Sequence, residues 1–167
     1  SFVPANPGPQ SIPPSDSFKV TIRFNPGPTS KGNLTADLVI TSNAKNAPTM
    51  TIPLSGFSAD YNFTTSIDNY DFGYICPNDT GRITLTIQNT GNVDLQLSLS
   101  ATNPYQVSPT PTVSVAKNSS SNIEVSISSA IEGLFNGTLT VTDNYCGITK
   151  QIAFRADVES PKINKQP

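Results

Sequence analysis

The chain has 167 residues, enough for one large domain or for two domains of about 80 residues, and its 35% hydrophobic content suffices for a buried core. The 10 Lys and Arg nearly balance the 12 Asp and Glu, and no basic run is present that would bind nucleic acid or an anionic lipid surface. No apolar run approaches the roughly 20 residues of a membrane-spanning helix, so we expect neither nucleic-acid binding nor direct membrane insertion.

Alternating apolar residues begin close to the N-terminus. Phe18, Val20 and Ile22 alternate with polar residues, and the same period of two recurs at 38–40 and at 50–54. A period of two places one apolar face on a β-strand, and no segment keeps a helical period. The sequence therefore predicts an all-β class, with three or four strands in residues 1–58.

Residues 59–68 read as a linker between two domains. Asp60, Asp68 and Asp71 lie in or beside this segment, and their oxygens could hold a calcium ion, but the spacing matches no calcium loop. We interpret these residues as solvated turn formers, and we predict no metal site and no cofactor. The aromatic residues of the same stretch are expected to pack at the domain junction rather than to stack on sugars: Tyr61, Phe63 and Tyr70.

Residues 69–159 carry about seven strands, the number found in an immunoglobulin-like sandwich, and residues 160–167 are predicted to be a C-terminal tail. Ile83, Leu85 and Ile87 alternate with polar residues up to an Asn-Thr-Gly-Asn turn at 89–92. These turn residues tolerate positive φ and reverse the chain. We expect a complete β-sandwich here.

The late strands have counterparts near the N-terminus. SIPPSDSFKVTIRF matches SVAKNSSSNIEVSIS, KGNLTADLVIT matches EGLFNGTLTVT, and TIPLSG falls on QIAFRA. Residues 70–105 have no such counterpart, so the sequence predicts tandem sandwiches of which the first is incomplete. Two explanations remain open: the chain is a fragment of a longer protein, or a strand from a neighbouring subunit completes the first sandwich.

These segments, together with DFGYI and the strand that ends in QNTGN, resemble the ASH-type (ASPM, SPD-2, Hydin) immunoglobulin-like domain and its bacterial surface relatives, the choice-of-anchor D repeats. The resemblance covers nearly the whole chain. It implies an immunoglobulin-like fold for both copies and is equally compatible with a surface protein and with an intracellular ciliary or centrosomal scaffold.

Catalytic chemistry has little basis in this composition. The chain contains no His, which removes the commonest general base and metal ligand, and its acidic residues are scattered over turns and outward strand positions. We expect the protein not to be an enzyme.

Cys76 and Cys146 are the only cysteines, and in a secreted domain such a pair would usually form one disulfide. However, Cys76 follows the first strand of the sandwich, whereas Cys146 lies in the last hairpin, at the opposite end of a strand roughly 26 Å long. An intradomain disulfide, an intermolecular disulfide and free thiols all remain open.

Five sequons for N-glycosylation are present. Asn78 and Asn118 lie in predicted turns, where an acceptor must be exposed, so sugars are expected there first. The other sequons lie at Asn33, Asn62 and Asn136.

The leading hypothesis is a non-enzymatic structural or adhesive module of an extracellular, cell-surface stalk or fibre. Its partners would be neighbouring subunits, adjacent domains or glycans. The alternatives are the intracellular scaffold and an accessory carbohydrate-binding module of a larger secreted enzyme.

Overall fold

The computed structural model describes residues 1–5, 8–109 and 111–161. Its regular structure over these residues consists of strands without helices, which confirms the predicted all-β class. The chain divides into two compact units, Ser1–Asp60 and Tyr61–Pro167.

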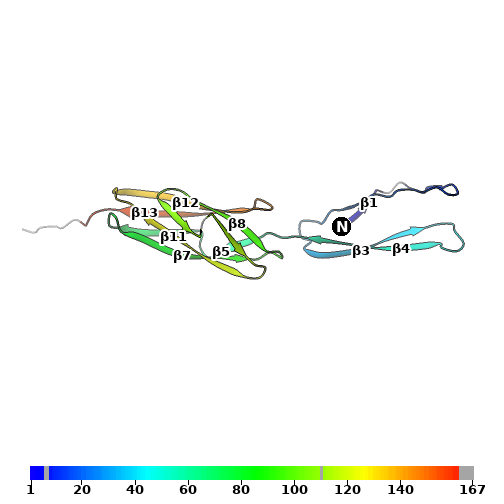
Figure 1. The fold of residues 1–167 in the computed structure, drawn as a ribbon, viewed down its shortest axis with the longest axis horizontal. Coiled ribbons are helices and arrows are strands. Elements are labelled where there is room, and N and C mark those ends of the chain that lie inside the picture. The colour runs from blue at the N-terminus through cyan, green and yellow to red at the C-terminus, as the bar shows by residue number, and fades with distance from the viewer. Residues whose placement is uncertain (6–7, 110, 162–167) are drawn as a thin grey trace, which may run out of the picture. The chain divides into compact units, whose positions relative to one another are not determined.

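The first unit contains two separate pairs of antiparallel strands (Figure 1). β1 (Phe2–Pro4) pairs with β2 (Ile22–Phe24). β3 (Gly32–Thr41) and β4 (Thr49–Ser58) form a long hairpin, and neither strand has a second neighbour among the described residues.

The second unit is a sandwich of two sheets, in which the sheet with β12 and β13 faces the sheet with β7 and β11 (Figure 1). The five-stranded sheet has the order β10-β8-β12-β13-β6, and the four-stranded sheet has the order β5-β7-β11-β9. The strands are β5 (Phe63–Thr65), β6 (Asn69–Ile75), β7 (Thr80–Asn89), β8 (Leu95–Ala101), β9 (Tyr105–Ser108), β10 (Thr112–Val115), β11 (Ser120–Ser128), β12 (Gly133–Asp143) and β13 (Thr149–Val158).

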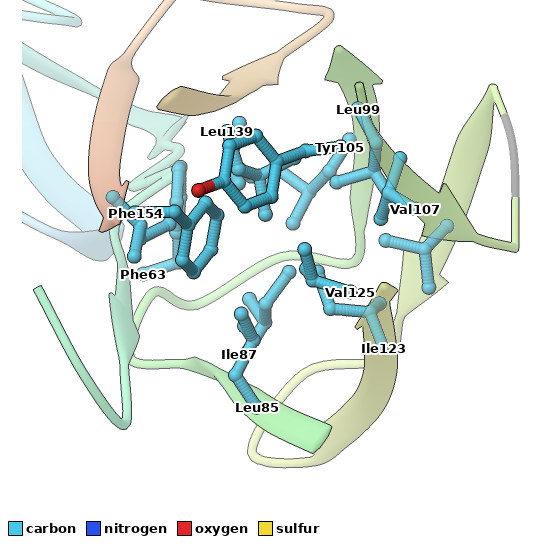
Figure 2. Close-up of a cluster of buried hydrophobic side chains, with 14 of the residues drawn as sticks. Phe63, Leu85, Ile87, Leu99, Tyr105, Val107, Ile123, Val125, Leu139 and Phe154 are labelled. Carbon is cyan, nitrogen blue, oxygen red and sulfur yellow. The ribbon is translucent and has the colours of Figure 1, made fainter. Parts of the chain in front are cut away.

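The core of the second unit lies between these sheets, where alternate aliphatic side chains from both inner faces meet (Figure 2). Leu85 and Ile87 of the predicted strand are fully buried, while Ile83 near its start is only partly buried. This outcome follows from the period of two, because every second side chain of a strand points to the same face.

Tyr105 combines an aromatic core contact with a partly buried hydrogen bond. Its ring lies 5.4 Å from that of Phe154, and its hydroxyl donates to the backbone carbonyl of Phe135 at 2.9 Å (Figure 2). Burial, assisted by the negative charge of Asp71, raises the pKa of Tyr105 to about 12, so the hydroxyl keeps its proton at neutral pH. Gly137 makes room for the ring, because a Cβ there would lie 2.3 Å from it.

β6 lies at the edge of the five-stranded sheet and runs parallel to β13, unlike the other pairs of that sheet. Its ladder is interrupted by a bulge that contains Gly73, whose φ is +69°. Asp71 accepts a hydrogen bond from the Gly73 N–H and pairs with Arg155 at 2.8 Å. These two contacts hold the pKa of Asp71 below its usual value, the backbone hydrogen bond having the larger effect.

The hairpin of the first unit repeats the β12–β13 hairpin in pairing register. Gly32 opposes Ser58 as Gly133 opposes Val158, and Leu38 opposes Ile52 as Leu139 opposes Ile152. Thr41 and Thr49 close the first ladder as Thr142 and Thr149 close the second. The repeat seen in the sequence is therefore also a repeat of hydrogen-bonded pairs.

The two hairpins differ in how their apolar faces are covered. Val141 and Ile152 are fully buried, whereas their counterparts Ile40 and Ile52 remain 40% and 38% exposed. Among the described residues, the buried hydrophobic side chains all lie between Phe63 and Val158. The first unit therefore presents the same apolar pattern without the strands that would bury it.

Two expectations require correction. The segment 59–68 is not a linker throughout, because β5 pairs with β7 and Phe63 is fully buried in the core. The second unit has nine strands in its described part rather than about seven, since the short β5 and β9 add to the four-stranded sheet. The expected tail at 160–167 falls largely on residues 162–167, which lie outside the described residues.

Ile52 and Ile152 occupy equivalent positions in the two hairpins, so alanine substitutions there measure how much stability the burial of each side chain contributes. Ile152→Ala should lower the free energy of unfolding of the second unit by about 2–5 kcal/mol, because it opens a cavity in a closed core. Ile52→Ala should cost the first unit less than about 1.5 kcal/mol, because part of its side chain is already in water. Hydrogen exchange, read separately in peptides covering each hairpin, reports both values. Equal losses at the two positions would contradict the exposure of the first hairpin.

Candidate functional site

Two of the three acidic residues considered for calcium binding form ion pairs with separate partners. Asp60 pairs with Lys31 at 2.5 Å, and Asp71 pairs with Arg155 as described above. No group of three or more His, Cys, Asp or Glu side chains suited to a metal ion occurs within the described part of the chain. The structure thus assembles no metal ligands from the residues that the sequence suggested.

The aromatic residues considered for the domain junction make contacts within the second unit. Phe63 belongs to the core, with the ammonium group of Lys150 lying 6.0 Å from its ring centroid. Tyr61 stacks on Tyr145 of the β12–β13 turn, with 5.2 Å between ring centroids. Tyr70 meets Phe72 edge to face. These rings fasten the start of the second unit to its own strands, and packing at the domain junction stays a prediction.

The Asn-Thr-Gly-Asn turn is organised by the buried side chain of Asn89. Its amide nitrogen donates to the carbonyls of Val93 and Val115 at 2.8 and 3.0 Å, and its Oδ1 accepts from the Gly91 N–H at 2.9 Å. A single side chain thus satisfies three backbone groups and joins the turn to β10. This residue has a structural role that turn propensity alone did not reveal.

The β12–β13 turn lies at the same end of the sandwich, because the Asn144 N–H donates to the carbonyl of Gln96 at the start of β8. The carboxylate of Asp143 is buried, and its Oδ2 accepts from the N–H groups of Tyr145 and Cys146. Its Oδ1 has no hydrogen-bond partner within the described chain. Asp143 therefore shapes the turn that presents Cys146.

The two cysteines lie at opposite ends of the second unit. Cys76 follows Ile75, which opposes Val158 at the end of β13, whereas Cys146 precedes the beginning of the same strand. The ten residues of β13 span about 33 Å, far beyond the 7 Å Cα separation that a disulfide tolerates. Both thiols are free and exposed. An intradomain disulfide is thus the wrong alternative, and free thiols or an intermolecular disulfide remain.

All five sequon asparagines are exposed. Asn78 and Asn118 occupy turns and adopt positive φ angles of 69° and 59°. The other three lie within strands or directly beside one: Asn33 in β3, Asn136 in β12, and Asn62 before β5.

An open groove of about 1120 Å³ lies on the first unit. Its lining includes residues 8–12 and residues 38–43, the latter running from β3 into the turn that follows it. Phe18 and Val20 contribute apolar surface and are 43% and 37% exposed. No Asp, Glu, Lys or Arg occurs among the described residues that line it. This neutral, partly apolar groove is the candidate functional site, and sequence reasoning did not locate it.

Comparison with known families supplies the context for these features. The profile of the HYDIN/CFA65/VesB-like immunoglobulin-like domain matches residues 62–157, which is more than half of the chain. The chain belongs to this family. Its second unit is an ASH/PapD-like β-sandwich module, and the resemblance to ASH-type domains is confirmed. A search of curated proteins found no relative. Among the described residues, no helix has the length and apolar character needed to cross a membrane.

One solved structure of the ASH type supports this fold, and two others align less closely. The ASH/PapD-like domain of human CEP192 (PapD-like domain 7) aligns with a TM-score of 0.53 at 10% identity, covering 61% of this chain and 88% of that domain. A protein of unknown function from Porphyromonas gingivalis W83 aligns with a TM-score of 0.48 at 14% identity, covering 83% of this chain and 71% of that chain. A putative carbohydrate binding protein from Bacteroides ovatus ATCC 8483 aligns with a TM-score of 0.47 at 15% identity, covering 57% of this chain and 36% of that chain. Identities this low describe the fold alone.

The role assigned to Asn89 can be tested against an exposed asparagine. Asn89→Ala should destabilise the second unit by about 1–3 kcal/mol, because it leaves buried backbone groups without partners. Asn122→Ala, which removes one exposed hydrogen bond to the Thr86 hydroxyl, should change stability by less than about 0.5 kcal/mol. Urea denaturation followed by circular dichroism measures both. Comparable losses in the two variants would argue against the structural role of Asn89.

The position of the thiols predicts how the protein oxidises. Because Cys76 and Cys146 cannot meet within one unit, mild oxidation should join separate molecules into dimers and longer multimers. Cys76→Ser or Cys146→Ser alone should stop the series at the dimer, since one thiol remains. Non-reducing electrophoresis shows the series, with reduced protein as the control. Monomeric protein that has lost both free thiols would contradict the geometry.

Proposed function

We propose that the protein is a non-enzymatic structural or adhesive module of an extracellular stalk or fibre, in which immunoglobulin-like units space or join other domains. The carrying observation is the tandem repeat, in which two units of one chain share a hairpin of the same register. Repeated sandwiches are well suited to spacing, because each unit adds length without requiring a catalytic centre. The uncharged groove and the two outward thiols favour contacts with other protein chains.

The second candidate function is an intracellular scaffold. The observation that favours it is the match to the HYDIN/CFA65/VesB-like family. The same sandwich would then organise partner proteins in a reducing compartment, where exposed thiols stay reduced. Cysteine state and glycosylation separate these two roles, because neither disulfides nor N-linked sugars are expected on the scaffold.

The deciding experiment is the intact mass of the protein isolated from the cells that make it, with and without reductant. For the extracellular module we expect a disulfide-linked species that reductant releases, or sugars that peptide mapping places first at Asn78 and Asn118. Protein recovered inside the cell in a reduced and unmodified form would overturn the extracellular role in favour of the scaffold. Sedimentation at several concentrations then measures whether the module self-associates.

A further inference from the structure

We infer that the outer face of the five-stranded sheet in the second unit binds a basic segment of a partner protein at the row of residues Leu134, Asp157 and Tyr74, here called the outer row. An Arg or Lys of the partner would lie over Asp157, with its aliphatic stem between Leu134 and Tyr74. The inference names a partner class for the structural role proposed above and in that respect rests on it. Binding is measured on the isolated protein, so its failure would leave the proposed role itself untouched.

The pairing register places the three residues of the outer row side by side. Asp157 of β13 opposes Leu134 of β12 on one side and Tyr74 of β6 on the other. The chain neighbours of Asp157, Ala156 and Val158, are fully buried, so alternation directs Asp157 to the outer face. Because neighbouring strands lie about 4.8 Å apart, the Cα atoms of Leu134 and Tyr74 are roughly 10 Å apart across Asp157.

The bulge in β6 brings Tyr74 to this face. Tyr70 and Phe72 pack against the core, so strict alternation would direct Tyr74 inward as well. The extra residue at Gly73 shifts the alternation, with the result that Tyr74 is 76% exposed while Ile75 packs against the core. Bulges commonly re-aim a side chain in this way. The exposed ring is therefore the product of a specific backbone feature.

The apolar side chains of the outer row are among the most exposed in the second unit. Tyr74 is 76% exposed and Leu134 is 53% exposed, and Ile131, in the turn that leads into β12, is 73% exposed. The other large hydrophobic side chains of the described second unit that are exposed, Tyr145 and Ile148, belong to the β12–β13 turn. Apolar surface gathered in one place is typical of a protein interaction site.

The carboxylate of the outer row has no cation beside it. In the adjacent row, two residues earlier on β13, the guanidinium of Arg155 pairs with Asp71 of β6 at 2.8 Å. Asp157 forms no ion pair with any residue that the structure describes. One row of this face is thus neutralised, whereas the next presents a negative charge between two apolar side chains.

The other described cations of the second unit do not serve the outer row. Arg82 pairs with Glu124 across β7 and β11 of the four-stranded sheet. Lys117 lies in the turn after β10, and Lys150 lies near the start of β13, whereas the outer row lies at the end of that strand. A cation for Asp157 therefore has to come from outside the described part of the unit.

The chemistry of the occupant follows from a carboxylate between two apolar side chains. Arg and Lys have an aliphatic stem that packs on apolar surface and a cationic head, which the face of the Tyr74 ring also attracts. Glu159 follows Asp157 by two residues and, together with Tyr74, lines a hollow of about 210 Å³. An extended segment with basic residues at every second position has the spacing of these two carboxylates. An acidic segment would meet repulsion instead.

The probe is a fluorescent peptide, Gly-Leu-Ser-Arg-Ser-Arg-Gly, which presents one Leu and two Arg side chains at alternate positions. Fluorescence anisotropy with the full chain, under reducing conditions that keep both thiols from cross-linking, should show saturable binding at one peptide per chain. A control peptide with Glu in place of both Arg should bind at least about tenfold more weakly. Added salt should weaken the binding of the Arg peptide, because it screens the charges.

Two pairs of variants locate the binding site. Asp157→Asn should weaken binding by at least about fivefold, whereas Glu124→Gln, which removes a carboxylate that already has its cation on the other sheet, should leave it within about twofold. Tyr74→Ser should also weaken binding by at least about fivefold. Its control is Tyr145→Ser, which changes a 64% exposed ring in the β12–β13 turn and should leave binding within about twofold. Circular dichroism verifies that each variant is folded.

Several results would overturn the inference. These are the absence of saturable binding, equal affinity for the Glu peptide, and binding that tolerates both Asp157→Asn and Tyr74→Ser. A dimer in sedimentation that Asp157→Asn dissociates would make a second copy of the chain the occupant instead of a separate partner. Lys162 and Lys165 follow the sandwich in the sequence. If replacing both with Ala raised the affinity by about fivefold or more, the chain's own residues would be the occupant, which would equally overturn the assignment.

Discussion

The structure depends on one constraint: the apolar face of a β-hairpin must be covered by neighbouring strands and by an opposing sheet. The hairpin formed by β12 and β13 carries aliphatic residues on one face, and that face is buried because β8 and β6 flank it within the sheet and the four-stranded sheet lies opposite. A strand pair without such neighbours leaves its apolar side chains in water, since two strands alone cannot enclose them. The same ladder therefore has different energetic consequences in the two units.

In the second unit, polar side chains satisfy backbone hydrogen-bonding groups at the turns, where the alternating apolar pattern ends. Asn89 satisfies backbone groups of a turn that carries no ladder hydrogen bonds, and Asp143 does the same for the β12–β13 turn. Tyr105 places its hydroxyl against the backbone carbonyl of Phe135 at a partly buried position. A buried backbone group without a partner costs free energy comparable to a lost hydrogen bond, so these side chains allow the chain to turn at the edge of a closed core.

The sequence predicted those parts of the fold that depend on period and repetition. Alternation identified the strands around Leu85, Leu97, Val125 and Leu139, and self-similarity identified the incomplete first copy. It failed at Phe63, because a three-residue strand with one apolar residue has too few positions to display a period, and its burial depends on pairing with β7. The groove was also beyond reach, since it is defined by the distance between two segments that are far apart in sequence. The separation of the cysteines was anticipated in part, because strand length alone argued against their pairing.

The bulged edge of the second unit has a consequence for assembly. A regular edge strand offers a continuous row of N–H and C=O groups to any passing chain, whereas a bulge and a fixed ion pair interrupt that row. At β6, Gly73 breaks the ladder and the Asp71–Arg155 pair holds charge beside it. Hydrogen-bonded growth of the sheet is thereby discouraged on that side. Any strand that adds to the second unit would consequently have to use one of its other edges, which are β10 in the same sheet and β5 and β9 in the four-stranded sheet.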